Sequence, residues 1–208
     1  MTSTAISVKP LRADARRNRE RVLEAAREIF GRDGIEAQID DIAAGAGVGV
    51  GTVYRHFATK DALIQALAAR YFEGENQIAR EALELDDPWE AFTGFIRNGA
   101  ELLARNRALA QIATERPEVM RDAALAADQE LGFFTVLEKL ISRAKKARVL
   151  RKDFQLEDIP AIMCSLGALQ VSRGAYANWR RVLEMVLDGC HAPDGAKLPP
   201  LTAKLPRR

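Results

Sequence analysis

Closely spaced glycines divide the stretch between residues 38 and 63, QIDDIAAGAGVGVGTVYRHFATKDAL, into two short apolar segments. Before the glycines, apolar residues recur at the spacing of one helix face, at Ile39, Ile42, Ala43 and Ala46. Glycine tolerates the left-handed backbone that closes a helix, so Gly45 and Gly47 predict a turn. A second helical stripe follows at Val50, Val53, Tyr54 and Phe57. Two short helices joined by a glycine-containing turn are typical of a helix-turn-helix.

With its flanking segments, this pattern resembles the DNA-binding signature of the TetR (tetracycline repressor) family of bacterial transcription regulators. The segments that carry the resemblance are Asp41-Ile42-Ala43, Ala46-Gly47-Val48, Gly51-Thr52-Val53-Tyr54-Arg55-His56-Phe57 and Lys60-Asp61-Ala62-Leu63. The chain departs from the family pattern in two places. Gly49 stands where a serine commonly caps the recognition helix. Ala37-Gln38 replace the threonine or serine that usually precedes the first helix of the motif. A lost cap costs about 1 kcal/mol relative to Ser or Thr, and less when glycine replaces it.

A recognition helix is expected from about Val50 to His56, because an α-helix fits the major groove of B-DNA and reads base edges with its first residues. The resemblance implies phosphate contacts at four positions, Thr52, Tyr54, His56 and Lys60. It also implies that Arg55 helps to recognise the base sequence, since the guanidinium group of an arginine can form two hydrogen bonds with a guanine. The predicted DNA-binding set is Arg16, Arg17, Gln38, Gly49, Val50, Gly51, Thr52, Tyr54, Arg55, His56 and Lys60.

Several of these residues have a second interpretation. Tyr54 is expected to do two things at once, burying its ring in the small core and presenting its hydroxyl group. His56 could be a helix cap instead of a DNA contact. Val50 could touch a thymine methyl group, and Gln38 could reach a phosphate or a base edge.

The net charge of +2 does not by itself indicate a nucleic-acid partner, but the distribution of charge does. Residues 1–21 contain six lysines and arginines against two acidic residues, directly before the helix-turn-helix. Arg16 and Arg17 in this segment are expected to touch DNA phosphates. The alternative is that they form a solvated basic face, as most charge runs do.

The chain is predicted to be all-α, because apolar residues recur at helical spacing and no alternating pattern of strand length competes. Four parts are expected: a flexible basic arm at 1–13, a three-helix helix-turn-helix DNA-binding domain at 14–62, a helical bundle for ligand binding and dimerisation at 63–190, and a disordered proline-rich tail at 191–208. Thr59 is expected to cap the helix that joins head to body, and Pro88 and Pro160 to lie in opening helical turns.

The resemblance implies a pocket for a small-molecule inducer in the helical body. Aromatic, aliphatic and sulfur-bearing residues could line an apolar cavity there. The predicted set is Trp89, Phe92, Phe95, Ile96, Met120, Phe133, Phe134, Met163 and Tyr176. Each of these residues could instead belong to the core.

A homodimer is expected, because one short recognition helix reads only a few base pairs and a palindromic operator presents two half-sites. In this family the last two helices pair with those of the partner, and here they would span about 158–175 and 177–190. The predicted interface residues are Ser165, Ala168, Ser172, Trp179, Val182 and Val186. The small residues among them could serve internal packing only.

The function favoured by the sequence is that of a ligand-responsive, sequence-specific transcription regulator, most often a repressor that a small molecule releases from its operator. The alternative is an all-helical small-molecule carrier or enzyme without DNA binding. No nucleophile–base set, metal site or cofactor is indicated, and GAGVGVG does not fit G-x-G-x-x-G. Two isolated cysteines and the lack of a membrane-length apolar run favour the cytoplasm.

Overall fold

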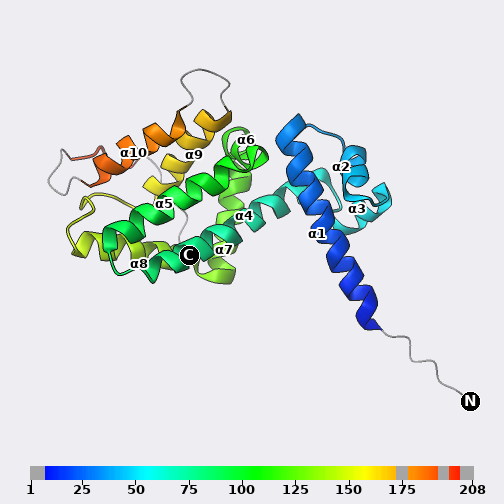
Figure 1. The fold of residues 1–208 in the computed structure, drawn as a ribbon, viewed down its shortest axis with the longest axis horizontal. Coiled ribbons are helices and arrows are strands. Elements are labelled where there is room, and N and C mark those ends of the chain that lie inside the picture. Colours follow the sequence, from blue (N-terminus) through cyan, green and yellow to red (C-terminus); the bar gives the residue numbers. More distant parts are fainter. Residues whose placement is uncertain (1–7, 172–177, 192–196, 202–208) are drawn as a thin grey trace, which may run out of the picture. The chain divides into compact units, whose positions relative to one another are not determined.

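The computed structural model describes residues 8–171, 178–191 and 197–201, and within these ranges it contains ten α-helices and no strand (Figure 1). The prediction of an all-α fold is therefore confirmed for these residues. The chain forms two compact units, residues 1–67 and residues 68–208. Residues 1–7 of the predicted arm, Ser172, Tyr176 and most of the predicted tail lie outside the described ranges.

The first unit contains α1 (Val8–Asp33), α2 (Ile39–Ala46), α3 (Val50–His56) and the first turns of α4 (Lys60–Leu83). The first helix begins at Val8, so residues 8–13 are helical and do not belong to the predicted flexible arm. Pro10 permits this early start, because a proline is tolerated within the first turn of a helix. Gly34 follows the end of α1 with a φ of 90°, a left-handed backbone that glycine adopts without strain.

The turn between α2 and α3 depends on Gly47. This residue has left-handed backbone angles, φ 62° and ψ 40°, and its N–H donates to the carbonyl groups of Ala43 and Ala44. The N–H of Val48 also donates to the carbonyl oxygen of Ala43, at 3.0 Å. Together these bonds satisfy carbonyl groups at the end of α2, which would otherwise lack partners.

Replacing Gly47 with alanine is expected to lower the free energy of unfolding of the first unit by about 1–2 kcal/mol, because a Cβ atom strains left-handed backbone. The new Cβ would also lie 2.6 Å from Nη2 of Arg21, but this flexible side chain can move aside. Gly31→Ala is the matched control. It lies inside α1 with no atom within 4 Å of an added Cβ, so it should stabilise the unit. Equal melting shifts for the two variants would contradict this account of the turn.

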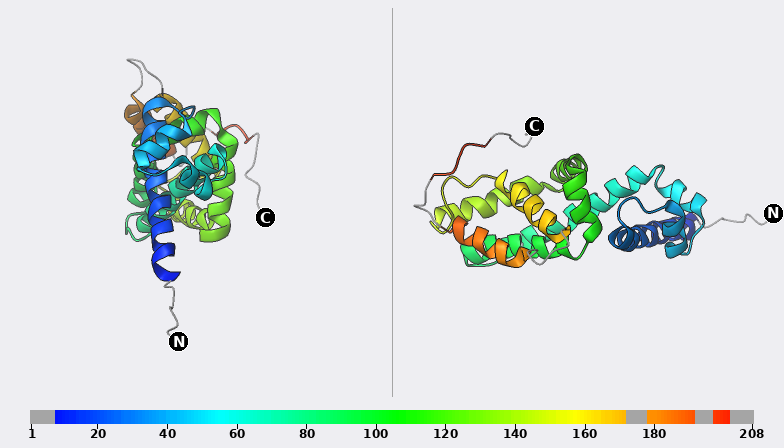
Figure 2. Two further views of the ribbon diagram at one scale, coloured as in Figure 1. Left: turned by 90° about the vertical axis from the view of Figure 1, so that its right-hand side faces the viewer. Right: turned by 90° about the horizontal axis from the view of Figure 1, so that it is seen from above.

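The core of the first unit is built by the inner faces of its four helical segments. Its fully or almost fully buried residues include Val22, Ala26, Phe30, Ile42, Ala43, Val53, Phe57 and Leu63. Thr59 caps α4 as predicted, since its Oγ1 accepts a hydrogen bond of 3.0 Å from the N–H of Ala62. The two short helices are held in place by this core and lie beside α1 (Figures 1 and 2).

The second unit contains the rest of α4 and six further helices: α5 (Pro88–Ala104), α6 (Arg107–Glu115), α7 (Pro117–Leu131), α8 (Phe133–Lys146), α9 (Asp158–Val171) and α10 (Trp179–Cys190). The predicted break before Pro88 is confirmed, because the carboxylate of Asp87 accepts hydrogen bonds from the N–H groups of Trp89 and Glu90. Asn106 caps α6 in the same way through the N–H of Leu109, a helix start that the sequence did not reveal.

Helices α5, α8, α9 and α10 share one apolar core, and α9 packs against α5, α6 and α10 (Figure 2). Two ion pairs join α10 to α5 at its surface, Arg97 with Glu184 at 2.8 Å and Arg180 with Glu101 at 2.7 Å. No helix among the described residues is long and apolar enough to cross a membrane. In the predicted tail, the N–H of Leu198 donates to the carboxylate of Asp153.

Candidate functional site

Helix α3 has one buried face and one exposed face. Val53 and Phe57 are 1 % and 4 % exposed and anchor the helix in the core of the first unit. Gly51 and Arg55 are exposed on the helix, and Tyr54 is 48 % exposed. The expectation that the ring of Tyr54 is buried in the core is therefore wrong: of this stripe, Val53 and Phe57 enter the core. About half of Tyr54 is open to a partner.

The other residues at α3 that were predicted to contact DNA are partly buried or, in the case of Gly49, have no side chain. Val50, Thr52 and His56 are half-buried, and Gly49 is exposed at the N-cap without a side-chain cap. Nε2 of His56 is buried and has no hydrogen-bond partner among the residues that the structure describes. Burial, together with the positive charges of Arg55 and Arg19, lowers the pKa of His56. His56 is therefore neutral at pH 7, and a DNA contact through it would be a hydrogen bond without added charge.

Two predicted residues outside α3 already have partners within the first unit. Nζ of Lys60 lies 3.7 Å from Oε2 of Glu36 and 5.9 Å from the ring centre of Phe30. Nε2 of Gln38 donates to the carbonyl oxygen of Glu36 at 3.3 Å. Both interactions are at the surface, where such pairs contribute little and yield readily to a phosphate.

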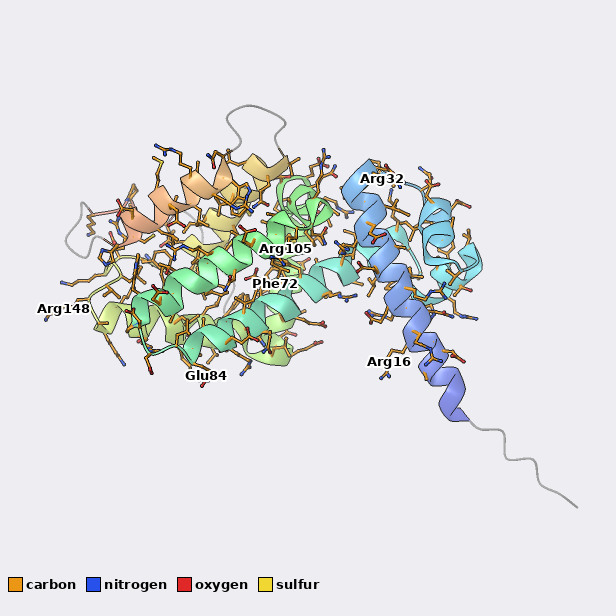
Figure 3. The ribbon with its side chains drawn as sticks, viewed as in Figure 1. Arg16, Arg32, Phe72, Glu84, Arg105 and Arg148 are labelled. Carbon is orange, nitrogen blue, oxygen red and sulfur yellow. The ribbon has the colours of Figure 1, made fainter. Side chains whose placement is uncertain are left out.

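The predicted arginines lie on the N-terminal half of α1. Arg16 is exposed (Figure 3). Arg17 is also exposed and forms an ion pair with Asp14, one helical turn away. Arg19, by contrast, lies over the ring of Phe57, with its Cζ 5.2 Å from the ring centre. Arg19 therefore places a positive charge at the end of α3, a role that periodicity alone did not reveal.

The second unit contains a partly open cavity of about 430 Å³. Its walls come from α4 to α9 and from Leu156, and most of the lining side chains are apolar; Figure 3 marks one of them, Phe72 on α4. The volume falls within the range of roughly 300–1,000 Å³ that is usual for small-molecule sites. This unit can therefore hold a compact apolar molecule.

Five of the residues predicted for a pocket line this cavity: Phe95, Met120, Phe133, Phe134 and Met163. Trp89, Phe92 and Ile96 do not, which corrects that part of the prediction. Phe92 packs edge-on against Phe154, with ring centres 5.2 Å apart, and Trp89 packs against Phe92 and His191. Ile96 is fully buried in the shared core. Tyr176 lies outside the described residues.

The cavity also contains residues that the sequence analysis did not assign to it, above all Tyr71 and Glu75 on α4. Glu75 is 3 % exposed, its carboxylate accepts a hydrogen bond from Tyr71, and burial raises its pKa to about 7. Burial, followed by the charge of Glu75, also raises the pKa of Tyr71. The available signal was spacing, because Glu75 follows Leu67 and Tyr71 at intervals of four on the apolar stripe of α4.

The predicted dimer residues divide between the surface and the core. Ser165 and Ala168 are exposed on α9, and Val182 and Val186 are half-buried on α10. Trp179 is only 9 % exposed and belongs to the core, so it offers a partner little surface. Met185 on α10 is 66 % exposed and was not predicted from the sequence to lie at the interface. Ser172 lies outside the described residues.

Comparisons with known proteins agree with this two-unit arrangement. Residues 22–67 match the family described as "Bacterial regulatory proteins, tetR family", and residues 87–192 match "Transcriptional regulator SbtR-like, C-terminal domain". The HTH-type transcriptional regulator UidR of Escherichia coli (strain K12) is 28% identical over 173 residues, which cover 81% of this chain and 84% of UidR.

Solved structures give the same result. The TetR transcription regulatory protein from Mycobacterium vanbaalenii is 32% identical, with a TM-score of 0.55, and the match covers 88% of this chain and 99% of that protein. The TetR transcriptional regulator SCO0520 from Streptomyces coelicolor is 26% identical, with a TM-score of 0.57, and the match covers 83% of this chain and 98% of that one.

A helix-turn-helix unit followed by a helical unit with an apolar cavity defines a DNA-binding regulator that responds to a small molecule. The two family matches and the match to the mycobacterial structure identify the family of this regulator. The chain belongs to the TetR family of transcription regulators. It is a ligand-responsive, sequence-specific DNA-binding protein, and the members of this family are regulators of transcription rather than enzymes.

Proposed function

We propose that this protein is a homodimeric repressor of the cytoplasm that binds a palindromic operator through α3 and leaves it when a mainly apolar effector fills the cavity of the second unit. The observation that carries the proposal is the exposed face of α3. Gly51, Tyr54 and Arg55 are open to solvent on a helix whose other face is fixed in the core. That helix fits a major groove, where Arg55 can read a guanine and Tyr54 can bond a phosphate.

The positive charges around α3 support the same proposal. Arg19 lies beside Phe57, which directly follows α3, and Arg16 and Arg17 lie on α1 of the same unit. Their side chains are exposed, and an arginine that neutralises a phosphate releases a bound counterion. Operator affinity should accordingly fall steeply as the salt concentration rises. A gel shift with genomic fragments tests this, and a shift that is insensitive to salt, or no shift at all, would favour the carrier alternative.

The composition of α9 supports dimerisation. Asp158 in its first turn is its one charged residue. Even so, Ala161, Cys164, Ser165 and Ala168 are exposed along its length. Gly167 faces inward instead, since an added Cβ would lie 3.4 Å from Leu103. An exposed helix face without charge fits the surface that a second copy covers, and Met185 would extend this face onto α10.

Release by an effector follows from the position of the cavity on α4. Tyr71, Phe72 and Glu75 line the cavity, and the same helix begins at Lys60 in the first unit. An effector that binds more tightly to one conformation of α4 shifts the population of molecules toward that conformation. The factor by which operator affinity changes can be no larger than the ratio of the effector's affinities for the two conformations.

A larger side chain in the cavity tests whether the effector that releases the protein from its operator binds there. Ala124 lines the cavity, so Ala124→Phe should raise the effector concentration needed for half-release by about 10-fold, because it occupies the ligand's space. Ala126 is exposed on the same helix and does not line the cavity, so Ala126→Phe is the matched control. Release is measured as loss of an operator shift. If both variants respond like the parent protein, the effector site lies elsewhere.

A further inference from the structure

The proposed effector site contains one buried carboxyl group in an otherwise apolar interior. Among the described residues that line the cavity, the charged ones are Glu75, Glu118 and Arg121. Glu118 and Arg121 are exposed, and each has an ion-pair partner on the surface, Arg116 and Asp122 respectively. Glu75 is 3 % exposed. The carboxyl group of Glu75 is therefore the charged group that a molecule inside the cavity would meet.

The immediate surroundings leave this carboxyl group incompletely satisfied. Tyr71 donates one hydrogen bond to it, but Oε1 has no hydrogen-bond partner among the described parts of the chain. A buried oxygen without a partner is costly, because the group has lost its hydration without gaining a hydrogen bond. Oε1 thus offers an unused acceptor on the wall of the cavity.

Gly99 on α5 makes room for the carboxyl group. A Cβ atom at this position would lie 2.8 Å from both oxygens of Glu75, so the carboxyl group would have to move if a side chain were added there. The glycine lets the carboxyl group sit directly against the backbone of α5. The buried position of the Glu75 carboxyl group therefore depends on the absence of a side chain at Gly99.

We propose that the effector is a mainly apolar molecule that carries one protonated amine, and that this amine pairs with Glu75. This inference rests on the proposed function, because it assumes that the cavity is the effector site. An ammonium group supplies both things that the site lacks, a donor for Oε1 and a positive charge for a carboxylate in an apolar setting. A carboxylate ligand would bring a second negative charge beside the first. An alcohol would supply the donor without the charge.

Three probes of equal chain length separate these cases: octylamine, 1-octanol and octanoate. Their affinities for the full chain are measured by titration calorimetry at pH 8. Octylamine should bind about 10-fold more tightly than either of the others, the size expected of a charge-assisted hydrogen bond in a buried site. Glu75→Gln keeps the shape and removes the charge, so it should abolish this preference while 1-octanol affinity changes by less than about 2-fold.

Glu118→Gln is the matched control, because it removes a carboxylate from the exposed side of the same cavity. It should leave the preference for octylamine intact. The inference is overturned if octanoate or 1-octanol binds as tightly as octylamine, if octylamine fails to bind, or if Glu75→Gln leaves the preference unchanged. A folded Glu75→Gln protein is verified by its binding of 1-octanol and by its melting curve.

The pH dependence gives an independent readout. With a pKa of about 7, Glu75 is mostly protonated at pH 6, and pairing with an ammonium must remove that proton. Octylamine affinity should therefore rise by up to about 10-fold from pH 6 to pH 8 and level off above pH 8, because a lysine-like amine stays charged throughout. The neighbouring Tyr71 and Cys164 have pKa values raised by burial and stay neutral over this range, while Glu118 and Arg121 keep their surface partners. Glu75→Gln should show no such rise.

A gel-shift assay with the operator, on the same protein preparations, distinguishes a wrong ligand class from a wrong effector mechanism. If the amine preference is absent but some other compound that fills the cavity releases the operator, only the ligand class is wrong. If octylamine binds with the expected preference but no cavity ligand changes operator affinity, the proposed effector mechanism is wrong and the binding site remains.

Discussion

A glutamate in place of Gly51 is expected to lower operator affinity by at least about 100-fold without unfolding the first unit. Gly51 is exposed on α3, and no atom lies within 4 Å of the Cβ that a substitution would add, so the folded protein has room for the side chain. In the proposed complex the same position lies close to the duplex. A carboxylate there would meet a row of phosphates and replace attraction with repulsion.

The matched control for this prediction is Gly31→Glu. Gly31 is a helical glycine of α1 in the same unit, and an added Cβ there also has no atom within 4 Å, so the change in net charge is the same. Operator affinity should fall by only a few-fold, through the weaker long-range attraction. Affinities are measured by fluorescence anisotropy at fixed salt, with melting curves for both variants. Equal losses would mean that net charge, and not the face of α3, governs binding.

Local chemistry made much of the fold predictable from the sequence. Gly47, Thr59 and Pro88 each have a residue-specific reason to end or begin a helix, and all three act as predicted. The break at Asn106 was missed because it interrupts a nearly continuous apolar pattern and depends on a single side-chain cap. The early start of α1 was missed because the basic residues before Asp14 suggested an arm, although such residues are also good helix formers.

The cavity was predictable only in part, because periodicity shows that a side chain faces inward but not whether it meets a neighbour or a void. Phe92 and Phe95 lie on the same face of α5, and each is 1 % exposed. Phe95 lines the cavity, whereas Phe92 packs on Phe154. The difference depends on how α5 crosses its neighbours, and no short sequence pattern encodes a crossing angle. Glu75 was not predicted for another reason: glutamate is common in exposed helix positions, so the residue type does not indicate burial even on an apolar stripe.

The exposed face of α3 illustrates the opposite case. Val53 and Phe57 follow the helical spacing into the core, and that fixes the direction in which Gly51 and Arg55 must point. Tyr54 broke the expectation because helical spacing alone does not fix how deeply a side chain on the stripe is buried, and Tyr54 is 48 % exposed.

The second large effect is expected at α9, where Ala168→Glu should convert the dimer to monomers and reduce operator affinity by about 100-fold or more. Ala168 is exposed on the uncharged face of this helix, so the isolated unit can accept a glutamate there. In the proposed dimer the carboxylate would be buried without a partner, which disfavours association strongly. Each monomer would then bind a single half-site and lose the gain from joining two heads.

Ala126→Glu is the matched control, because Ala126 is an exposed helical alanine of α7 that lies outside both the cavity lining and the proposed interface. It adds the same charge to the same unit and should leave both the dimer and the operator shift intact. Sedimentation equilibrium measures the mass, and the operator shift is repeated at protein concentrations above and below the dissociation constant found. A dimer that survives Ala168→Glu would place the interface on another face, whereas a monomer that still binds the full operator tightly would show that one head suffices.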